Sequence, residues 1–219
     1  MTALSLTSRF KIRTKHHLVL SFATFFMLGT LYVSIPGNDP KYLWSMATGY
    51  TSIVLLAITL LVGPLNIYYK NLNPVTTDLR RDVGIWCALT GFAHVIVGIQ
   101  VHMGNIWLYF FKAVEGENAF KFRDDFFGSS NYVGLVATFI LLLLLLLSND
   151  LSLKWLRTKR WKNLQRLSYL LFILVLMHGV MYQIIEKRKP GIIILFAIIL
   201  LVPVIGQAVG FSISRKAKS

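Results

Sequence analysis

The chain has 219 residues, of which 55% are hydrophobic and only 15% are charged, and its formal net charge is +14. An ordinary soluble domain is about 45–50% apolar and about 25% charged, so the composition excludes a soluble globule, a disulfide-stapled secreted domain and a coiled coil. The charged residues leave six long apolar stretches, each able to cross about 30 Å of hydrocarbon as a helix. We therefore predict an all-α membrane protein, a single domain over residues 1–219, with six transmembrane helices. The predicted spans are about 18–35, 43–66, 83–106, 130–148, 167–186 and 191–213.

The first span follows four basic residues, as the apolar region of a signal peptide does. It is longer than that region usually is and no small-x-small cleavage site follows it, so we expect a retained helix. Sixteen of the 23 lysines and arginines lie before the first span, in 67–82, in 149–166 and after the last span. Because cytoplasmic loops are enriched in these residues, both ends are predicted to be cytoplasmic. The positive charge is then a topology signal that also attracts anionic membrane lipid, and it is not read as nucleic-acid binding.

The third span contains two histidines, and ionisable residues inside a membrane helix indicate function by default. His94 lies 11 residues after Val83, which at 1.5 Å per residue is about 16 Å deep, near the middle of the membrane. His102 lies about 28 Å deep by the same rise, near the outer face. Gly91 and Gly98 share the helix face of His94, which favours either room for a flat ring or tight helix packing.

The loop at about 112–127 mixes charged residues with four phenylalanines. This composition is typical of an interfacial segment with an aromatic belt, and a docking surface for an external partner is the alternative. The last span carries Gly206 and Gly210, a GxxxG pattern that favours close helix packing.

The fifth span places His178 at the depth of His94, because it lies 11 residues after Leu167 and both spans enter from the cytoplasmic side. At the depth of His102 the fifth span carries Glu186. The sequence thus predicts two imidazoles at one level, on two parallel helices.

The ligand count decides what such a pair can hold. A zinc site needs three or four protein ligands, and a proton relay needs a carboxylate partner within the spans. A haem needs only axial ligands, because the porphyrin supplies four nitrogens. We therefore predict haem iron between His94 and His178, with the glycines at 91 and 98 giving the ring room. For His102, His16 and His17 a hydrogen-bonded helix contact is the simpler interpretation, with His102 kept as the candidate for a second site.

Two strings in the sequence resemble a known family. Residues 80–87 (RRDVGIWC), followed by His94, resemble the third-helix signature of the ferric reductase-like transmembrane family. Residues 161–169 (WKNLQRLSY), followed by His178, resemble its fifth-helix motif W-x-x-L-H-R-L-x-Y. Both strings are most similar to the small haem-b branch, the membrane subunits of periplasmic methionine sulfoxide reductase systems.

The resemblance implies a multi-pass protein of the bacterial inner membrane whose haem b, held by His94 and His178, carries electrons across the membrane. In that branch the donor is quinol or a cytoplasmic flavin (FMN), and the acceptor is a periplasmic molybdenum-containing reductase. Gln165 stands where the motif has a histidine, which argues against a second haem. Arg81 and Arg166 are candidates to contact haem propionates or an anionic flavin, with anchoring at the cytoplasmic face as the alternative.

The chain contains no G-x-G-x-x-G fingerprint for a dinucleotide. We therefore expect an electron-transfer subunit that receives electrons from quinol or a separate flavin reductase, rather than a complete enzyme. Two alternatives stay open. One is a stand-alone ferric or cupric reductase, in which Glu115, Glu117, Asp124 and Asp125 attract the cation. The other is a cofactor-free transporter or scaffold, in which the histidines only pack.

Overall fold

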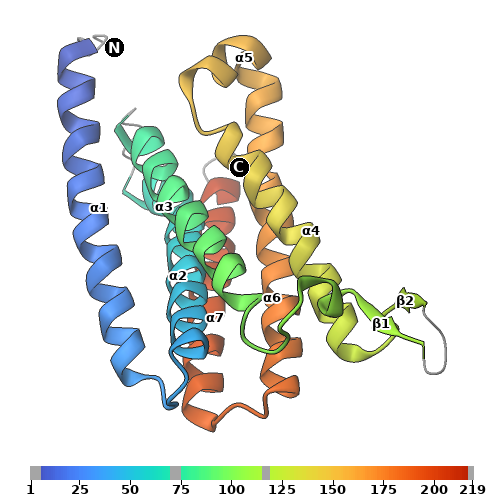
Figure 1. The fold of residues 1–219 in the computed structure, drawn as a ribbon. Helices are drawn as coiled ribbons and strands as arrows, with labels where there is room; N and C mark the ends of the chain where they lie inside the picture. The colour runs from blue at the N-terminus through green and yellow to red at the C-terminus, as the bar shows by residue number, and fades with distance from the viewer. Residues whose placement is uncertain (1–5, 70–74, 115–118, 217–219) are drawn as a thin grey trace.

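The computed structural model describes residues 6–69, 75–114 and 119–216, and the chain forms a bundle of long helices (Figure 1). The helices are α1 (Leu6–Ser34), α2 (Pro40–Tyr68), α3 (Val75–Gly98), α4 (Phe126–Leu146), α5 (Asp150–Gln165), α6 (Leu167–Ile185) and α7 (Pro190–Lys216). Between α3 and α4 lie a 3-10 turn, η1 (Ile106–Tyr109), and an antiparallel hairpin of β1 (Phe111–Ala113) and β2 (Phe120–Phe122). In Figure 1, α1 begins and α7 ends at the end of the bundle that carries α5. We call this the α5 end and the opposite one the hairpin end.

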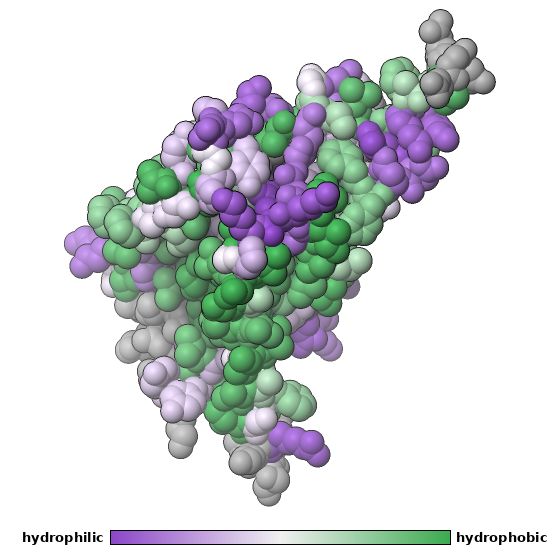
Figure 2. All heavy atoms as spheres, turned by 90° about the horizontal axis from the view of Figure 1, so that it is seen from below, coloured by the Kyte–Doolittle hydropathy of each residue, from purple (hydrophilic) through white to green (hydrophobic). Residues whose placement is uncertain are grey.

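Five helical segments among the described residues are long and apolar enough to cross a membrane: 8–34, 40–68, 126–146, 150–185 and 190–215. The prediction of an all-α, multi-pass membrane protein is confirmed to that extent. Large apolar side chains such as Phe22, Phe26 and Phe139 lie exposed on the outside of the bundle, as a lipid-facing surface requires. Figure 2, seen from the hairpin end, shows a largely hydrophobic surface interrupted by hydrophilic patches.

The helix that corresponds to the predicted third span, α3, is not one of these five segments, and its range differs from the predicted 83–106. Helix α3 ends at Gly98, because the Tyr109 hydroxyl donates to the Gly98 carbonyl at 3.0 Å and accepts the N–H of His102 at 3.0 Å. His102 therefore lies outside the helix, not inside a span. His94 lies four residues before the end of α3, nearer to the hairpin end than its predicted place near the middle of the span.

Residues 149–166, treated as a loop in the prediction, contain the helix α5 (Asp150–Gln165). The Asn149 side chain accepts the Ser152 N–H at 2.7 Å and caps the first turn of this helix. At Arg157 the backbone has a φ of 59°, in the left-handed region, and α5 bends there. The bend lets the chain turn back toward α6 within a short segment.

The helices pack in two extensive pairs, α2 with α3 and α4 with α6, while α7 covers α2. A Cβ atom added to Gly206 of α7 would lie 2.3 Å from Leu61 Cδ2, and one added to Gly210 would lie 2.9 Å from Pro64 Cβ. No larger side chain fits these two positions without movement, so the GxxxG pattern marks close helix packing, as predicted.

Ion pairs hold α1 against α3 at the α5 end. The carboxylate of Asp82 is fully buried and accepts hydrogen bonds from Arg13 at 2.6 Å and from His16 Nδ1 at 3.0 Å. His17 Nε2 lies 3.3 Å from the same carboxylate. The interpretation of His16 and His17 as hydrogen-bonded helix contacts is confirmed.

Two further carboxylates at this end pair with arginines. Hydrogen bonds from Arg9 to Asp78, at 2.7 and 2.8 Å, hold the pKa of that carboxyl below its usual value. The hydrogen bond from Arg81 to Asp150, at 2.6 Å, lowers the pKa of Asp150 in the same way. The pairs connect α1, α3 and α5, so they stabilise the α5 end in its ionised form.

Candidate functional site: a histidine pair between α3 and α6

The structure brings His94 of α3 and His178 of α6 together. Their ring centres are 6.4 Å apart, and the two ring planes make an angle of 80°. Both histidines are largely buried. The two imidazoles thus face one region of the bundle interior from opposite helices.

Each imidazole is hydrogen-bonded through the same ring nitrogen. His94 Nδ1 lies 2.8 Å from the backbone carbonyl oxygen of Ser45 on α2, and His178 Nδ1 lies 2.9 Å from that of Ser130 on α4. A carbonyl oxygen only accepts, so each Nδ1 carries the hydrogen. The hydrogen bond therefore leaves Nε2 of each ring unprotonated, with a lone pair free to bind a metal.

This arrangement fits a haem. Imidazole nitrogens lie about 2.0–2.1 Å from a bound metal, so two rings that coordinate one iron from opposite sides have their centres about 6.4 Å apart. His94 and His178 have that separation. Among the described residues, no cluster of three or more His, Cys, Asp or Glu side chains could hold a bare metal ion. The pair therefore suits a group that needs only two protein ligands.

His102 does not join the pair. Its Nε2 lies 2.7 Å from Oε1 of Glu186, the residue that the sequence predicted at the same depth. Its ring stacks on the Tyr182 ring with the two ring centres 6.0 Å apart. The centres of the Tyr182 and His178 rings are in turn 4.9 Å apart. His102 is thus held in a polar contact between α6 and the segment after α3, and aromatic rings lead from His178 toward it.

The two glycines on the face of His94 contact neighbouring helices. A Cβ atom on Gly91 would lie 2.6 Å from Leu141 Cδ2, and one on Gly98 would lie 3.3 Å from Ser45 Oγ. These contacts are close helix packing; a role of Gly91 and Gly98 in haem packing stays a prediction.

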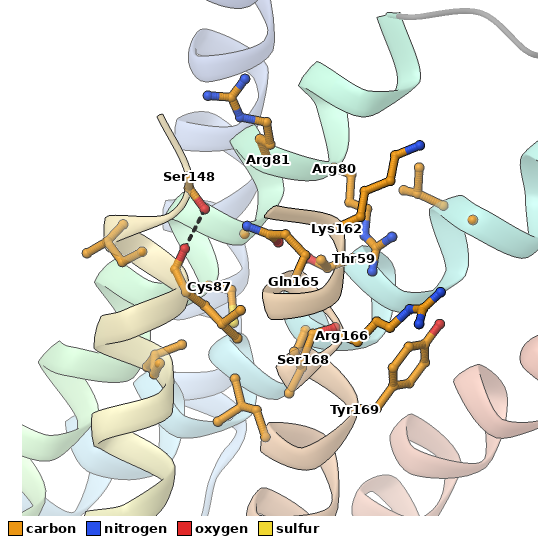
Figure 3. Close-up of a pocket in the computed structure, with 18 of the residues that line it drawn as sticks. Thr59, Arg80, Arg81, Cys87, Ser148, Lys162, Gln165, Arg166, Ser168 and Tyr169 are labelled. Atoms are coloured by element: carbon orange, nitrogen blue, oxygen red, sulfur yellow. Dashed lines mark hydrogen bonds between the residues drawn. The ribbon is translucent and has the colours of Figure 1, made fainter. Parts of the chain in front are cut away.

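A cavity of about 350 Å³ lies at the α5 end, between α2, α3, α4, α5 and α6 (Figure 3). Its lining includes several leucines and four basic residues, Arg80, Arg81, Lys162 and Arg166. Figure 3 shows Arg80, Lys162 and Arg166 gathered at one side, with the Gln165 amide near the middle. Arg81 and Arg166, the two arginines proposed from the sequence as propionate or flavin contacts, both line this cavity, and that role stays a prediction; the cavity itself was not predicted.

Four polar atoms of three residues that line this cavity are buried without a hydrogen-bond partner among the described residues: Gln165 Nε2, Ser168 Oγ, Arg81 Nε and Arg81 Nη2. The remaining Nη1 of Arg81 is bound to Asp150. Amide and guanidinium nitrogens donate, so the cavity suits a ligand that offers acceptor oxygens. Buried polar groups are almost always paired, which makes this cavity the second candidate binding site of the chain.

Sequence reasoning missed Ser45 and Ser130, because a backbone carbonyl acts here and the side-chain type gives no signal. It also missed Gly49 and Gly134, which lie against the two rings. A comparison of the second and fourth spans would have found one common string, S-x-x-x-G, near the start of each.

The sequence of the chain was compared with known proteins. The family described as ferric reductase like transmembrane component matches residues 48–176, a stretch that includes His94 and ends two residues before His178. Relatives from Salmonella paratyphi B, Salmonella newport and Salmonella heidelberg are each 29% identical over 158 residues, covering 70% of this chain and 71% of theirs. Each bears the name protein-methionine-sulfoxide reductase heme-binding subunit MsrQ.

No solved structure matches the chain. The family match and these relatives support a haem-binding, electron-transfer role in a membrane. Because the match covers more than half of the sequence, the chain belongs to the ferric reductase-like transmembrane family.

Proposed function

We propose that this chain is the haem b subunit of a transmembrane electron-transfer system. It takes electrons from quinol or a cytoplasmic flavin donor and delivers them to a periplasmic reductase, such as a methionine sulfoxide reductase. The observation that carries the proposal is the His94–His178 pair, with ring centres 6.4 Å apart and both Nδ1 atoms bound to carbonyls. Haem takes up and releases one electron at a time, and the role of the chain is to hold the haem between the two histidines.

The lysine and arginine asymmetry supports an inner-membrane protein with the α5 end in the cytoplasm. The cavity at that end is then the donor site. Leu141 lines it and packs on Gly91, one turn from His94. From Cys87, at the cavity wall, to His94 is about 10 Å along α3, a short distance for electron tunnelling.

Two donors suit the cavity by different contacts. The carbonyl oxygens of a quinone match the buried donors Gln165 Nε2 and Ser168 Oγ, whereas the phosphate of a flavin mononucleotide matches Arg80, Lys162 and Arg166. Gln165→Leu is expected to slow haem reduction by a soluble quinol analogue. An Arg166→Gln variant is expected to slow reduction by a flavin reductase instead. Stopped-flow absorbance at the haem bands measures both rates. If both variants are reduced by both donors as fast as the unmodified protein, this cavity is not the entry site.

The stand-alone metal reductase has weaker support. In the outer loop Asp124 is paired with Lys112, and Asp125 binds Arg123 at 2.7 Å while capping α4. These carboxylates are already neutralised by cations of the chain. Glu115 and Glu117 lie outside the described residues.

The decisive experiment is a reduced-minus-oxidised spectrum of purified protein with pyridine haemochrome quantification. We expect one haem b per chain, nearly complete loss of haem in His94→Ala and His178→Ala, and retention in His102→Ala as the matched control. Absence of haem from protein produced with haem in excess would leave only a transporter or scaffold. Equal loss in all three variants would show that the pair is not the iron site.

A further inference from the structure

The two histidines are held by matching segments of two different helices. On α2, Ser45 is followed four residues later by Gly49, and on α4, Ser130 is followed four residues later by Gly134. In both cases the serine carbonyl binds the imidazole Nδ1, at 2.8 and 2.9 Å. We call these residues the two Ser–Gly pairs.

The glycine of each pair lies against the same ring that the serine binds. A Cβ atom on Gly49 would lie 2.9 Å from His94 Nδ1 and 3.1 Å from its Cε1. A Cβ atom on Gly134 would lie 2.8 Å from His178 Cε1 and 2.9 Å from its Nδ1. No side chain fits either position with the ring where it is, so glycine lets each imidazole lie on the neighbouring helix backbone.

The serine hydroxyls lie farther from the imidazole nitrogens than the carbonyl oxygens do. Ser45 Oγ lies 3.4 Å from His94 Nδ1 and Ser130 Oγ lies 3.5 Å from His178 Nδ1. The carbonyls are therefore the main acceptors, and each ring is held by two contacts: a hydrogen bond at Nδ1 and a close approach of the neighbouring helix backbone. Hydrogen bonds of this kind orient metal-binding histidines and make them stronger ligands.

We propose that the two Ser–Gly pairs are positioning residues that hold both haem ligands in one tautomer with nearly perpendicular ring planes, and so tune the redox potential of the iron. The inference rests on the proposed function and deepens it. The 80° angle between the rings follows from two separate helix contacts, one for each histidine. His94 and His178 would hold the haem, and the two Ser–Gly pairs would restrict the rotation of each imidazole.

The angle between the ligand planes has a spectroscopic signature. Ferric haem with perpendicular imidazoles gives a strongly anisotropic low-spin electron paramagnetic resonance (EPR) signal, whereas parallel imidazoles give a rhombic one. We expect the strongly anisotropic signal from the unmodified protein. This measurement needs no variant, so it decides the question even where a substitution prevents folding.

Gly49→Ala and Gly134→Ala test the contacts themselves. Because the added methyl group reaches the ring, we expect each variant to shift the EPR signal toward the rhombic form, to change the midpoint potential, and to release haem about tenfold faster or more. Gly29→Ala is the matched control: it makes the same change in α1, where a Cβ atom meets nothing within 4 Å.

A rhombic signal from the unmodified, haem-loaded protein would overturn the inference. So would Gly49→Ala and Gly134→Ala variants that match Gly29→Ala in signal, potential and haem release. Either result leaves the haem assignment standing, whereas protein that binds no haem removes the proposed function itself.

Discussion

The buried carboxylate of Asp82 offers the sharpest test of how the ligand helix α3 is held. Its oxygens accept hydrogen bonds from Arg13 and His16 of α1, and none of its surface is exposed. Asp82→Asn keeps the shape of the side chain but removes its charge and replaces one acceptor oxygen by a donor. Arg13 then lacks its counter-ion at a partly buried position.

Removing one member of a buried ion pair costs about 3–5 kcal/mol. Arg13 is 24% exposed, so water recovers part of its solvation, and we expect a loss of about 2–3 kcal/mol. For a chain of this length that corresponds to a fall of about 5–10 °C in the midpoint of thermal unfolding. Asp78→Asn is the control. Its pair with Arg9 is more exposed than the Arg13–Asp82 pair, with Arg9 35% and Asp78 13% exposed, so its loss is expected to be smaller, about 1 kcal/mol.

Thermal unfolding in detergent, followed by circular dichroism, measures both variants under one set of conditions. The reasoning predicts that Asp82→Asn is clearly the less stable protein. An Asp82→Asn protein as stable as Asp78→Asn would show that burial of this carboxylate does not determine its contribution.

Three further outcomes follow from contacts in the structure. Arginine hydrogen bonds lower the pKa values of Asp78 and Asp150. The two ion pairs therefore stabilise the folded protein above about pH 4, and this stabilisation is lost as the pH falls below that value. The Asp78→Asn/Asp150→Asn double variant should flatten that part of a Tm-against-pH curve. Tyr109→Phe removes a buried hydroxyl that binds three backbone groups, and a loss of about 1–3 kcal/mol with faster amide exchange after α3 is expected. Gly179→Val places a Cβ atom 2.4 Å from the ring of Phe196 on α7. This overpacking should lower the free energy of unfolding by about 1–3 kcal/mol, measured by thermal unfolding.

The apolar stretches were predictable because charge is excluded from the membrane core, and counting residues along two of them brought His94 and His178 together. The same count paired His102 with Glu186, 2.7 Å apart. The end of α3 was not predictable in this way. The uncharged stretch continues beyond Gly98, and the helix stops there through a contact with Tyr109, eleven residues further on.

Other features depend on contacts between distant segments. Residues 150–165 are too rich in charge to suggest a membrane helix, yet they fold as α5 with their aspartate bound to Arg81. The carbonyls of Ser45 and Ser130 give no side-chain signal at all. The cavity beside Gln165 arises only when five helices assemble, so composition could indicate its basic residues but not its shape.

The packing of the bundle predicts what removal of haem does. Helices α2 and α3 form one extensive contact and α4 and α6 form another, while α3 touches α4 less. Each pair supplies one histidine and the carbonyl that orients it, so an iron bonded to both His94 and His178 links the two pairs. A ligand that binds only the folded state stabilises it in proportion to its affinity. Haem-free protein, or the His94→Ala/His178→Ala double variant, should therefore unfold at a lower temperature and exchange amides faster where α3 faces α6, with α7 on α2 unaffected. Uniform loss of protection over all helices would contradict this, because it would mean that the bundle folds as one unit without a join at the histidine pair.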